Sequence, residues 1–325
     1  MATARRSMDP VHEWKVPTIY PDVPSFLGVP FAGDVRALEV ADAAFLGVPF
    51  EGAPGVMRTY DRSLLTPIEL RKASLMYGGY LPEKDIDVFD HLKVVDFGDA
   101  SIAVRAPAEE AIASATDKIG QILGAGAIPI VVGGTETVAS YSLAQSLAAL
   151  GGRVGAVTLD AHGDNLSSHL GSGWMGAAWI ARMSEIPGID MRHHVHVGMR
   201  GPRNFREQVD WFRQRGSRVI FPRDVREKGV EWLVNQVIDV ACAGTDSSFC
   251  SVDLDVLDIG AAFGLIEPAG LSCTEVFEML FALGREGARG LCIGWVPKQT
   301  PELLSICTWM IVYFLAGVAK RKVDS

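Results

Sequence analysis

Two carboxylates and an imidazole follow directly after the apolar run VGAVTL, in the stretch Asp160-Ala-His-Gly-Asp164. In an extended segment alternate side chains point to the same face, so Asp160, His162 and Asp164 can converge on one point. Oxygen and nitrogen donors that converge in this way suit a divalent transition-metal ion. The motif therefore predicts a metal site at the end of a buried strand.

A second acidic cluster, SVDLDVLD, follows the apolar run SSFC and contains Asp253 and Asp255 two residues apart. These two side chains also share a face. Carboxylates crowded on an apolar strand are costly to bury unless a cation or a proton neutralises them. Taken alone, the cluster is as typical of a solvated strand end that caps the next helix as it is of a metal site. Together, the two clusters favour a shared binuclear metal site.

Composition and charge restrict the class of protein. The chain has 325 residues, of which 48% are hydrophobic and 34 are glycine, which fits one large α/β domain better than two small ones. A net charge of -9 without a basic block argues against nucleic-acid binding and against adhesion to an anionic membrane. It is compatible with a small cationic substrate or with an oppositely charged protein partner. Five scattered cysteines without CxxC spacing favour a reducing cytoplasm.

Short β-rich runs alternate with helical segments along most of the chain. The helical segments include 108–126 and 229–244, which both end in glycine, as helix C-termini often do. The β-rich runs lie at 43–50, 92–99, 127–134, 154–160, 194–201, 218–224, 247–255 and 290–297. Apolar strands that alternate with helices predict a mostly parallel sheet covered on both faces, with its active site at the carboxyl ends of the strands.

The two ends of the chain differ from this alternating pattern. The N-terminus is not typical of a secretory signal, and residues 1–25, which contain Pro17, Pro21 and Pro24, are predicted to form an extended arm. Residues 26–325 are predicted to form the domain. The uncharged segment 303–319 is slightly short for a comfortable membrane span. We interpret it as a helix of the core or of a subunit interface.

Several motifs together resemble the ureohydrolases, the family of arginases, agmatinases and related guanidine hydrolases. They include GVPFEGAPG, VVDFGDAS, VVGGTET, TLDAHGD, VGMRGP, SVDLDVLD and EPAGLSCTE. The resemblance implies a single-domain, three-layer αβα fold with a central, mostly parallel eight-stranded sheet, assembled as trimers or hexamers. It also implies two manganese ions, or sometimes nickel, which activate a water that attacks the guanidinium carbon.

The resemblance also assigns roles to individual residues. Glu275 matches the carboxylate that pairs with the guanidinium of the substrate. The implied metal ligands are Asp160, His162, Asp164, Asp253 and Asp255.

The chain departs from the family pattern at the site itself. Where the family has GGDHS, this chain has GGTET, so Glu136 stands at the position of a histidine that binds the first metal and would ligate through oxygen. An SHGT-like motif with a proton-shuttling histidine is replaced; our alignment puts Ser172 there, with His169 upstream as a substitute. A serine is not a base near neutral pH unaided. Gly294 replaces the glutamate of an EVNP-like motif.

These departures leave two possible functions, of which we favour the first. The first is a supporting subunit with a degenerate metal site, which completes a trimeric or hexameric assembly with a catalytic paralogue. Such a complex would hydrolyse a guanidino or biguanide compound and would resemble the two-subunit, nickel-dependent metformin hydrolases. The alternative is that the chain is itself a binuclear-metal guanidino-compound hydrolase, like an agmatinase or a guanidinobutyrase.

Neighbouring polar and aromatic residues have structural interpretations as well. His193, His194 and His196 are predicted to belong to a core strand rather than to a second metal cluster. Arg200 and Arg203 could contact either a substrate or a neighbouring subunit.

Overall fold

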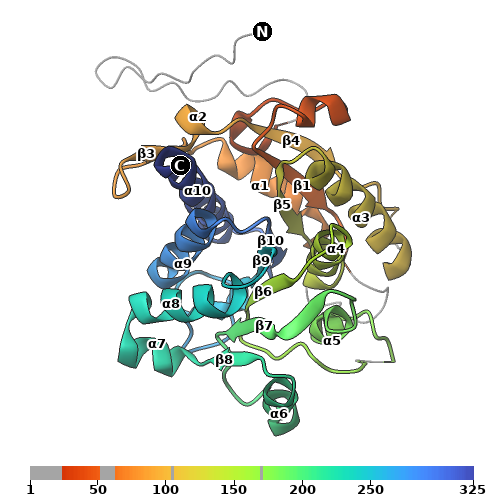
Figure 1. Ribbon diagram of the computed structural model, residues 1–325, viewed down its shortest axis with the longest axis vertical. Helices are drawn as coiled ribbons and strands as arrows, with labels where there is room; N and C mark the ends of the chain where they lie inside the picture. Colours follow the sequence, from red (N-terminus) through yellow and green to blue (C-terminus); the bar gives the residue numbers. More distant parts are fainter. Residues whose placement is uncertain (1–23, 52–62, 104–105, 169–170) are drawn as a thin grey trace.

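The computed structural model describes residues 24–51, 63–103, 106–168 and 171–325. His169 and nearly all of the predicted arm at 1–25 lie outside these residues. The chain forms a central eight-stranded sheet between two layers of helices (Figure 1). The predicted three-layer α/β architecture with an eight-stranded parallel sheet is confirmed in its described part.

All eight predicted β-rich runs form strands of this sheet, and all its strand pairs are parallel. The spatial order is β4-β1-β5-β10-β9-β6-β7-β8. The strands are β1 (Ala43–Val48), β4 (Val94–Asp99), β5 (Ile128–Gly133), β6 (Val154–Leu159), β7 (Ile189–Val197), β8 (Arg218–Ile220), β9 (Ser247–Asp253) and β10 (Leu291–Trp295). A separate antiparallel pair, β2 (Tyr80–Leu81) and β3 (Ile86–Asp87), was not predicted.

Helices cover both faces of the sheet because every central strand is apolar on both sides. One layer consists mainly of α3 (Ala108–Gly124), α4 (Glu136–Ala149), α5 (Trp179–Met183) and α6 (Arg206–Gln214). The opposite layer contains α1 (Thr66–Ser74), α8 (Val230–Ala241), α9 (Cys273–Glu286) and α10 (Pro301–Asp324). Two short helices, α2 (Val88–His91) and α7 (Pro222–Lys228), lie nearer the edges. The buried side chains accordingly form two clusters, one under each layer.

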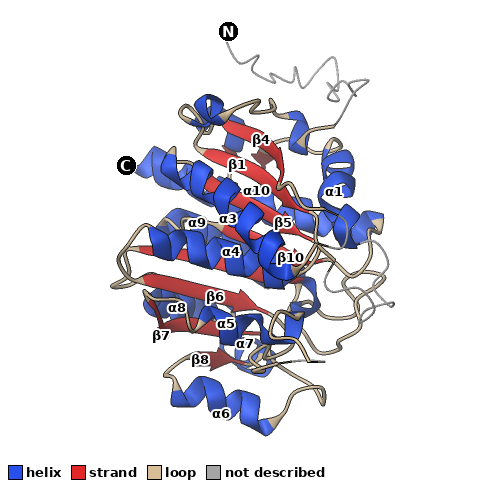
Figure 2. Cartoon of the chain, turned by 90° about the vertical axis from the view of Figure 1, so that its right-hand side faces the viewer, coloured by secondary structure: helices blue, strands red, loops and turns tan. Residues whose placement is uncertain are grey.

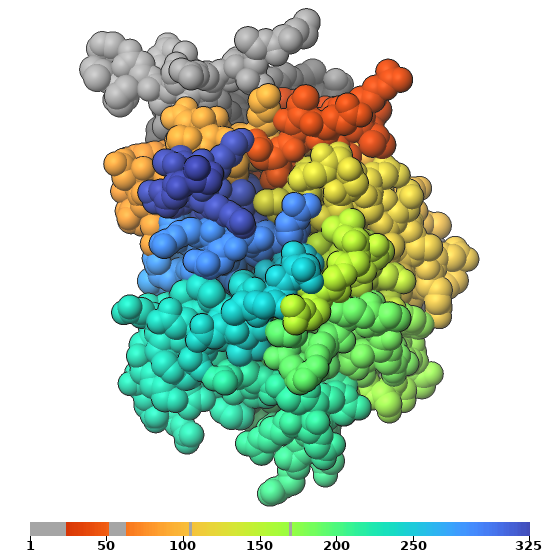
Figure 3. All heavy atoms as spheres, viewed as in Figure 1, coloured from red at the N-terminus to blue at the C-terminus, as the bar shows by residue number. Residues whose placement is uncertain are grey.

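Helix α10 contains the uncharged segment and is the one described helix whose length and composition would allow it to span a membrane. In the fold, 72% of its most apolar window is buried, and the helix packs against α9. Figure 3 shows its dark-blue end beside the lighter-blue α9 and the orange residues near β3. Of the two interpretations of this segment, a core helix or a helix of a subunit interface, the burial within the chain supports the core helix.

Candidate metal centre

Four adjacent strands at the middle of the sheet bring the candidate ligands to one edge. Strands β5, β10, β9 and β6 are neighbours and run in the same direction, so their carboxyl ends meet (Figure 2). Asp160 follows β6, and Asp253 ends β9. Glu136 opens α4 just after β5, and Gly294 lies in β10. Two motifs that are far apart in sequence thus share one site, as predicted.

Asp160, His162 and Asp255 form the tight core of this site. Their ligand atoms all lie within 4.8 Å of one another. His162 Nδ1 is 2.9 Å from Asp255 Oδ2 and 3.6 Å from Asp160 Oδ1. The two carboxylates are themselves held by backbone amides: the His162 N–H donates to Asp160 and the Ala161 N–H to Asp255. The arrangement directs the imidazole and both carboxylates to one point, as a metal centre requires.

The other three predicted ligands lie around this core. Glu136, Asp164 and Asp253 are all buried, and each interacts electrostatically with the core carboxylates. Asp253 also accepts a hydrogen bond from the Asp255 N–H, 2.8 Å away. Asp164 adopts a left-handed backbone conformation with φ 43°, which aspartate tolerates better than most residues. The structure therefore brings all six residues to one site, with three of them in closest contact.

Glu267 is a member of the site to which the sequence analysis gave no role, although it is the first residue of the motif EPAGLSCTE. It lies on the long loop after β9, its side chain is buried, and its Oε1 is 3.2 Å from His162 Nε2. Arg203 also donates to this oxygen, at 2.7 Å. A carboxylate on the outer nitrogen of a metal-binding histidine fixes the tautomer and the ring orientation. Glu267 occupies that position relative to His162.

Arg200 fastens the loop that carries Glu267. Its guanidinium donates to six backbone carbonyl groups, those of Gly198, Asp255, Val256, Leu257, Glu267 and Pro268. The carbonyls belong to the end of β7, the turn after β9 and the loop near Glu267. These contacts give Arg200 a structural role within the chain, which differs from both roles considered for it, contact with a substrate and contact with a neighbouring subunit.

The charges of the site perturb several pKa values. Burial, with Asp160 and Asp255 nearby, raises the pKa of Glu136 to about 8. Burial and the Asp255 charge raise the pKa of Asp160 to about 6. Burial opposes protonation of His162, but its contacts with Asp160 and Asp255 outweigh it and raise its pKa to about 11. A bound divalent cation would relieve this carboxylate crowding directly, so the donor set fits such an ion.

Ser172 and Glu275 make local contacts. Ser172 Oγ accepts a hydrogen bond from the Trp174 N–H at 3.1 Å. Glu275 lies in the first turn of α9, where its carboxylate binds the Ser272 N–H and hydroxyl in a capping box. The pattern Ser272-Cys-Thr-Glu275 is a sequence signature of that cap. The predicted roles of Ser172 and Glu275 toward a substrate stay predictions, and His169 lies outside the described residues.

Two of the three histidines of β7, His194 and His196, belong to the core as predicted, whereas His193 is partly buried and its Nδ1 lies 3.3 Å from the Val240 carbonyl oxygen. His194 and His196 are fully buried, and both bind Thr158 Oγ1, at 3.0 and 2.8 Å. Burial lowers the pKa of His196 to about 3 and that of His194 well below its usual value. Both rings are therefore neutral parts of the sheet's packing.

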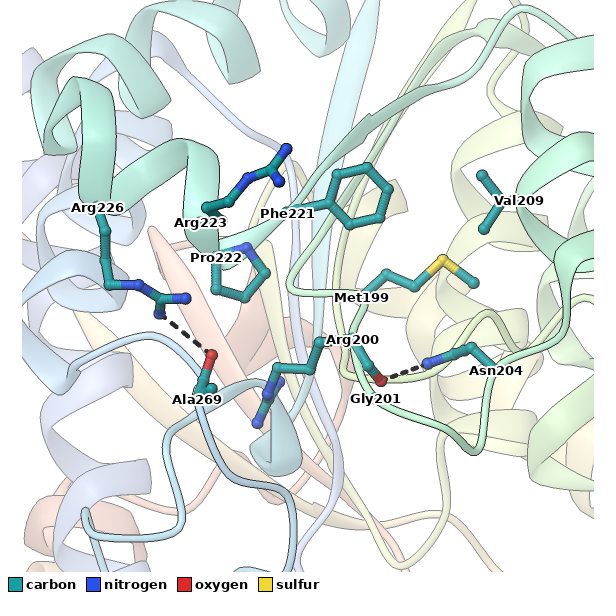
Figure 4. A pocket seen from close by; sticks show the side chains of 10 residues that line it. All are labelled: Met199, Arg200, Gly201, Asn204, Val209, Phe221, Pro222, Arg223, Arg226 and Ala269. Carbon is teal, nitrogen blue, oxygen red and sulfur yellow. Dashed lines mark hydrogen bonds between the residues drawn. The ribbon is translucent and has the colours of Figure 1, made fainter.

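A pocket of about 460 Å³ lies beside the metal centre, between the end of β7, helix α7 and the loop near Ala269 (Figure 4). Met199 and Phe221 line it together with Arg200 and Arg226, whose guanidinium reaches the Ala269 carbonyl. Asp160, His162 and Asp255 are not among its lining residues. The pocket is thus separate from the cluster of candidate ligands.

Comparison with known proteins agrees with this architecture. The chain is 29% identical over 262 residues to the agmatinase of Pyrococcus horikoshii. This match covers 78% of this chain and 85% of the agmatinase. It is 28% identical over 227 residues to human mitochondrial guanidino acid hydrolase, covering 69% of this chain and 62% of the relative. The alignment thus spans less than two thirds of the human protein's length.

Solved structures show the same fold. Proclavaminate amidino hydrolase from Streptomyces clavuligerus superposes with a TM-score of 0.81 at 23% identity, covering 93% of this chain and 99% of that one. Formiminoglutamase from Trypanosoma cruzi, solved with Mn²⁺, gives a TM-score of 0.78 at 23% identity and covers 92% and 100%. The model of the arginase family matches residues 41–293. The chain therefore belongs to the arginase family.

Proposed function

We propose that this chain is a metal-dependent hydrolase that cleaves a C–N bond of a guanidino compound at its own site. The observation that carries the proposal is the fixed imidazole of His162, whose Nδ1 faces Asp160 and Asp255 while Nε2 is tied to Glu267. This is the arrangement of a metal-ligating histidine with its orienting carboxylate. Relatives named guanidino acid hydrolase and guanidinobutyrase support the guanidino class of substrate.

The residues of the chain would divide the work as follows. Asp160, His162, Asp164, Asp253 and Asp255 would hold up to two manganese or nickel ions. An ion bound there would lower the pKa of a water molecule and so supply a nucleophile near neutral pH. Crowded carboxylates attract a guanidinium cation to the same edge of the sheet. Glu267 and Arg200 would keep the imidazole and the loop in place without contacting the substrate.

A second candidate function is the supporting subunit of a hetero-oligomer with a catalytic paralogue. The observation in its favour is the altered set of polar groups: Glu136 is a buried carboxylate among carboxylates, and the Ser172 hydroxyl accepts from the neighbouring Trp174 amide. A serine in this setting is a poor substitute for a base. In this case the complex would be trimeric or hexameric and would act on a guanidino or biguanide compound, as metformin hydrolases do.

One experiment separates the two candidates. The purified chain, loaded with Mn²⁺ or Ni²⁺, is assayed for amine or urea release from 4-guanidinobutyrate, agmatine and metformin. We expect metal-dependent turnover of at least one compound, abolished by Asp255→Asn and retained by Asp117→Asn, a change at an exposed position of α3. No turnover by the lone chain, with activity restored by the paralogue and kept when this chain carries Asp253→Ala, would establish the supporting role instead.

A further inference from the structure

Glu136 brings a buried carboxylate to the candidate metal centre. Glu136 is only 6% exposed. Its Oε2 atom has no hydrogen-bond partner in the part of the chain that the structure describes. Asp160, Asp164, Asp253 and Asp255 all lie close enough to interact with its charge. A buried carboxylate oxygen among like charges is costly unless a cation meets it.

Two glycines leave the space that the Glu136 side chain fills. A Cβ atom at Gly176 would lie 2.3 Å from Glu136 Oε1. A Cβ atom at Gly294 would lie 2.6 Å from Glu136 Cβ and 2.7 Å from its Cα. These separations are closer than real Cβ atoms come to other heavy atoms. Any side chain at Gly176 would force the carboxylate end of Glu136 to move, and any at Gly294 would displace the start of α4.

The backbone does not require glycine at either position. Neither Gly176 nor Gly294 is among the glycines with positive φ, so both lie where an alanine would be conformationally acceptable. Gly176 therefore leaves space for the Glu136 carboxylate, and Gly294 leaves space for the Cα and Cβ of Glu136 at the start of α4. One glycine comes from the 3-10 turn at Gly176–Ala178 and the other from β10, so the cradle is built from two separate elements.

We propose that Glu136 is a metal ligand of this chain and that Gly176 and Gly294 are positioning residues that direct its carboxylate into the centre. This inference rests on the proposed metal-dependent function and deepens it. With Glu136, the donor set consists of five carboxylates and one imidazole. Carboxylate-rich sets favour ions such as Mn²⁺, whereas imidazole suits Ni²⁺. Glu136 therefore shifts the preference of the site toward Mn²⁺, compared with a histidine at the same position.

The test measures metal binding to the metal-free, full-length chain by calorimetric titration with MnCl₂ and NiCl₂. We expect Glu136→Gln, Gly176→Ala and Gly294→Ala each to weaken Mn²⁺ binding at least tenfold. The matched control is Gly120→Ala, at an exposed glycine of α3 where an added Cβ meets nothing within 4 Å; it should bind Mn²⁺ as the unaltered chain does. Glu136→His should raise the ratio of Ni²⁺ to Mn²⁺ affinity at least tenfold.

Circular dichroism identifies any glycine variant that fails to fold. In that case the proposal is tested by Glu136→Gln, which preserves the shape of the side chain. Unchanged Mn²⁺ affinity in Glu136→Gln would overturn the proposal while leaving the metal-dependent function standing. An unchanged ratio of Ni²⁺ to Mn²⁺ affinity in Glu136→His would overturn the inferred preference. If the unaltered chain bound neither ion, the proposed function itself would fail, and this inference with it.

Discussion

His162 Nε2 lies 3.2 Å from Glu267 Oε1, although 105 residues separate the two in sequence. The contact closes the long loop after β9 over the end of β6. Arg203 donates to the same oxygen, which keeps the carboxylate facing the ring. The position of Glu267 therefore determines which nitrogen of His162 is available toward Asp160 and Asp255.

Replacing Glu267 by glutamine is expected to weaken metal binding by roughly 10- to 100-fold, because the orienting carboxylate of a ligating histidine contributes about that much. Titration of the metal-free variant with Mn²⁺ measures the effect. Glu110→Gln, at an exposed position of α3, serves as the control and should bind as the unaltered chain does. Equal affinities for the two variants would mean that the contact with His162 does not orient a ligand.

Replacing Arg200 by methionine is expected to destabilise the chain by roughly 2–4 kcal/mol, because buried carbonyl groups around the loop lose a shared donor. Arg226→Met offers a comparison at the same loop, since Arg226 donates to the Ala269 and Gly270 carbonyls, at 3.2 and 3.5 Å. That change should cost less than about 1 kcal/mol. Denaturant unfolding of the metal-free proteins measures both. Comparable losses would show that the carbonyl network does not depend on Arg200.

The framework of the site could be predicted because its signals are local. Apolar runs followed by polar residues indicate the carboxyl ends of β6 and β9, and the spacing of Asp160 and His162 places them on one face. The short pair β2 and β3 escaped prediction because two-residue strands carry no recognisable periodicity. The sequence also contains the helix-capping pattern at Ser272 and Glu275, which gives that glutamate a structural role beside the predicted one.

Glu267 could not be assigned from sequence for a different reason. Its contact with His162 depends on how a long loop returns across the sheet, and Arg200 fixes that path through carbonyl groups that any sequence would provide. Likewise, the fit of Glu136 between Gly176 and Gly294 depends on three segments that approach one another only in the folded chain. Sequence singles out Glu136 and Gly294 as departures from the family pattern, but neither Gly176 nor the space that the three residues share.

Acid should destabilise the core around His196. Burial lowers its pKa to about 3 from an ordinary value of 6.5, so its contribution to stability is present above pH 6.5 and is lost as the pH falls toward 3. We expect the midpoint temperature of His196→Gln to fall less steeply between pH 7 and pH 4 than that of the unaltered chain. His91→Gln, at an exposed position of α2, should keep the original slope. Calorimetric scans of the metal-free proteins at each pH measure the midpoint temperatures. Parallel slopes for all three proteins would contradict the lowered pKa of His196.

Helices α9 and α10 pack closely against each other at a reciprocal pair of glycines. A Cβ at Gly284 would lie 2.2 Å from the Phe314 carbonyl oxygen, and a Cβ at Gly317 would lie 2.0 Å from the Phe281 carbonyl oxygen. Both contacts involve backbone atoms, which cannot rotate away as a side chain can. Gly284→Ala and Gly317→Ala are therefore expected to destabilise the chain by roughly 1–3 kcal/mol through overpacking, although alanine is the better helix former. Gly120 lies at an exposed position of α3 where an added Cβ has open space. Gly120→Ala should therefore stabilise the chain by up to about 1 kcal/mol through helix propensity alone. Urea unfolding of the three variants compares the two effects directly. If the α9 and α10 variants gained stability as the α3 variant does, the close packing of these two helices would be refuted.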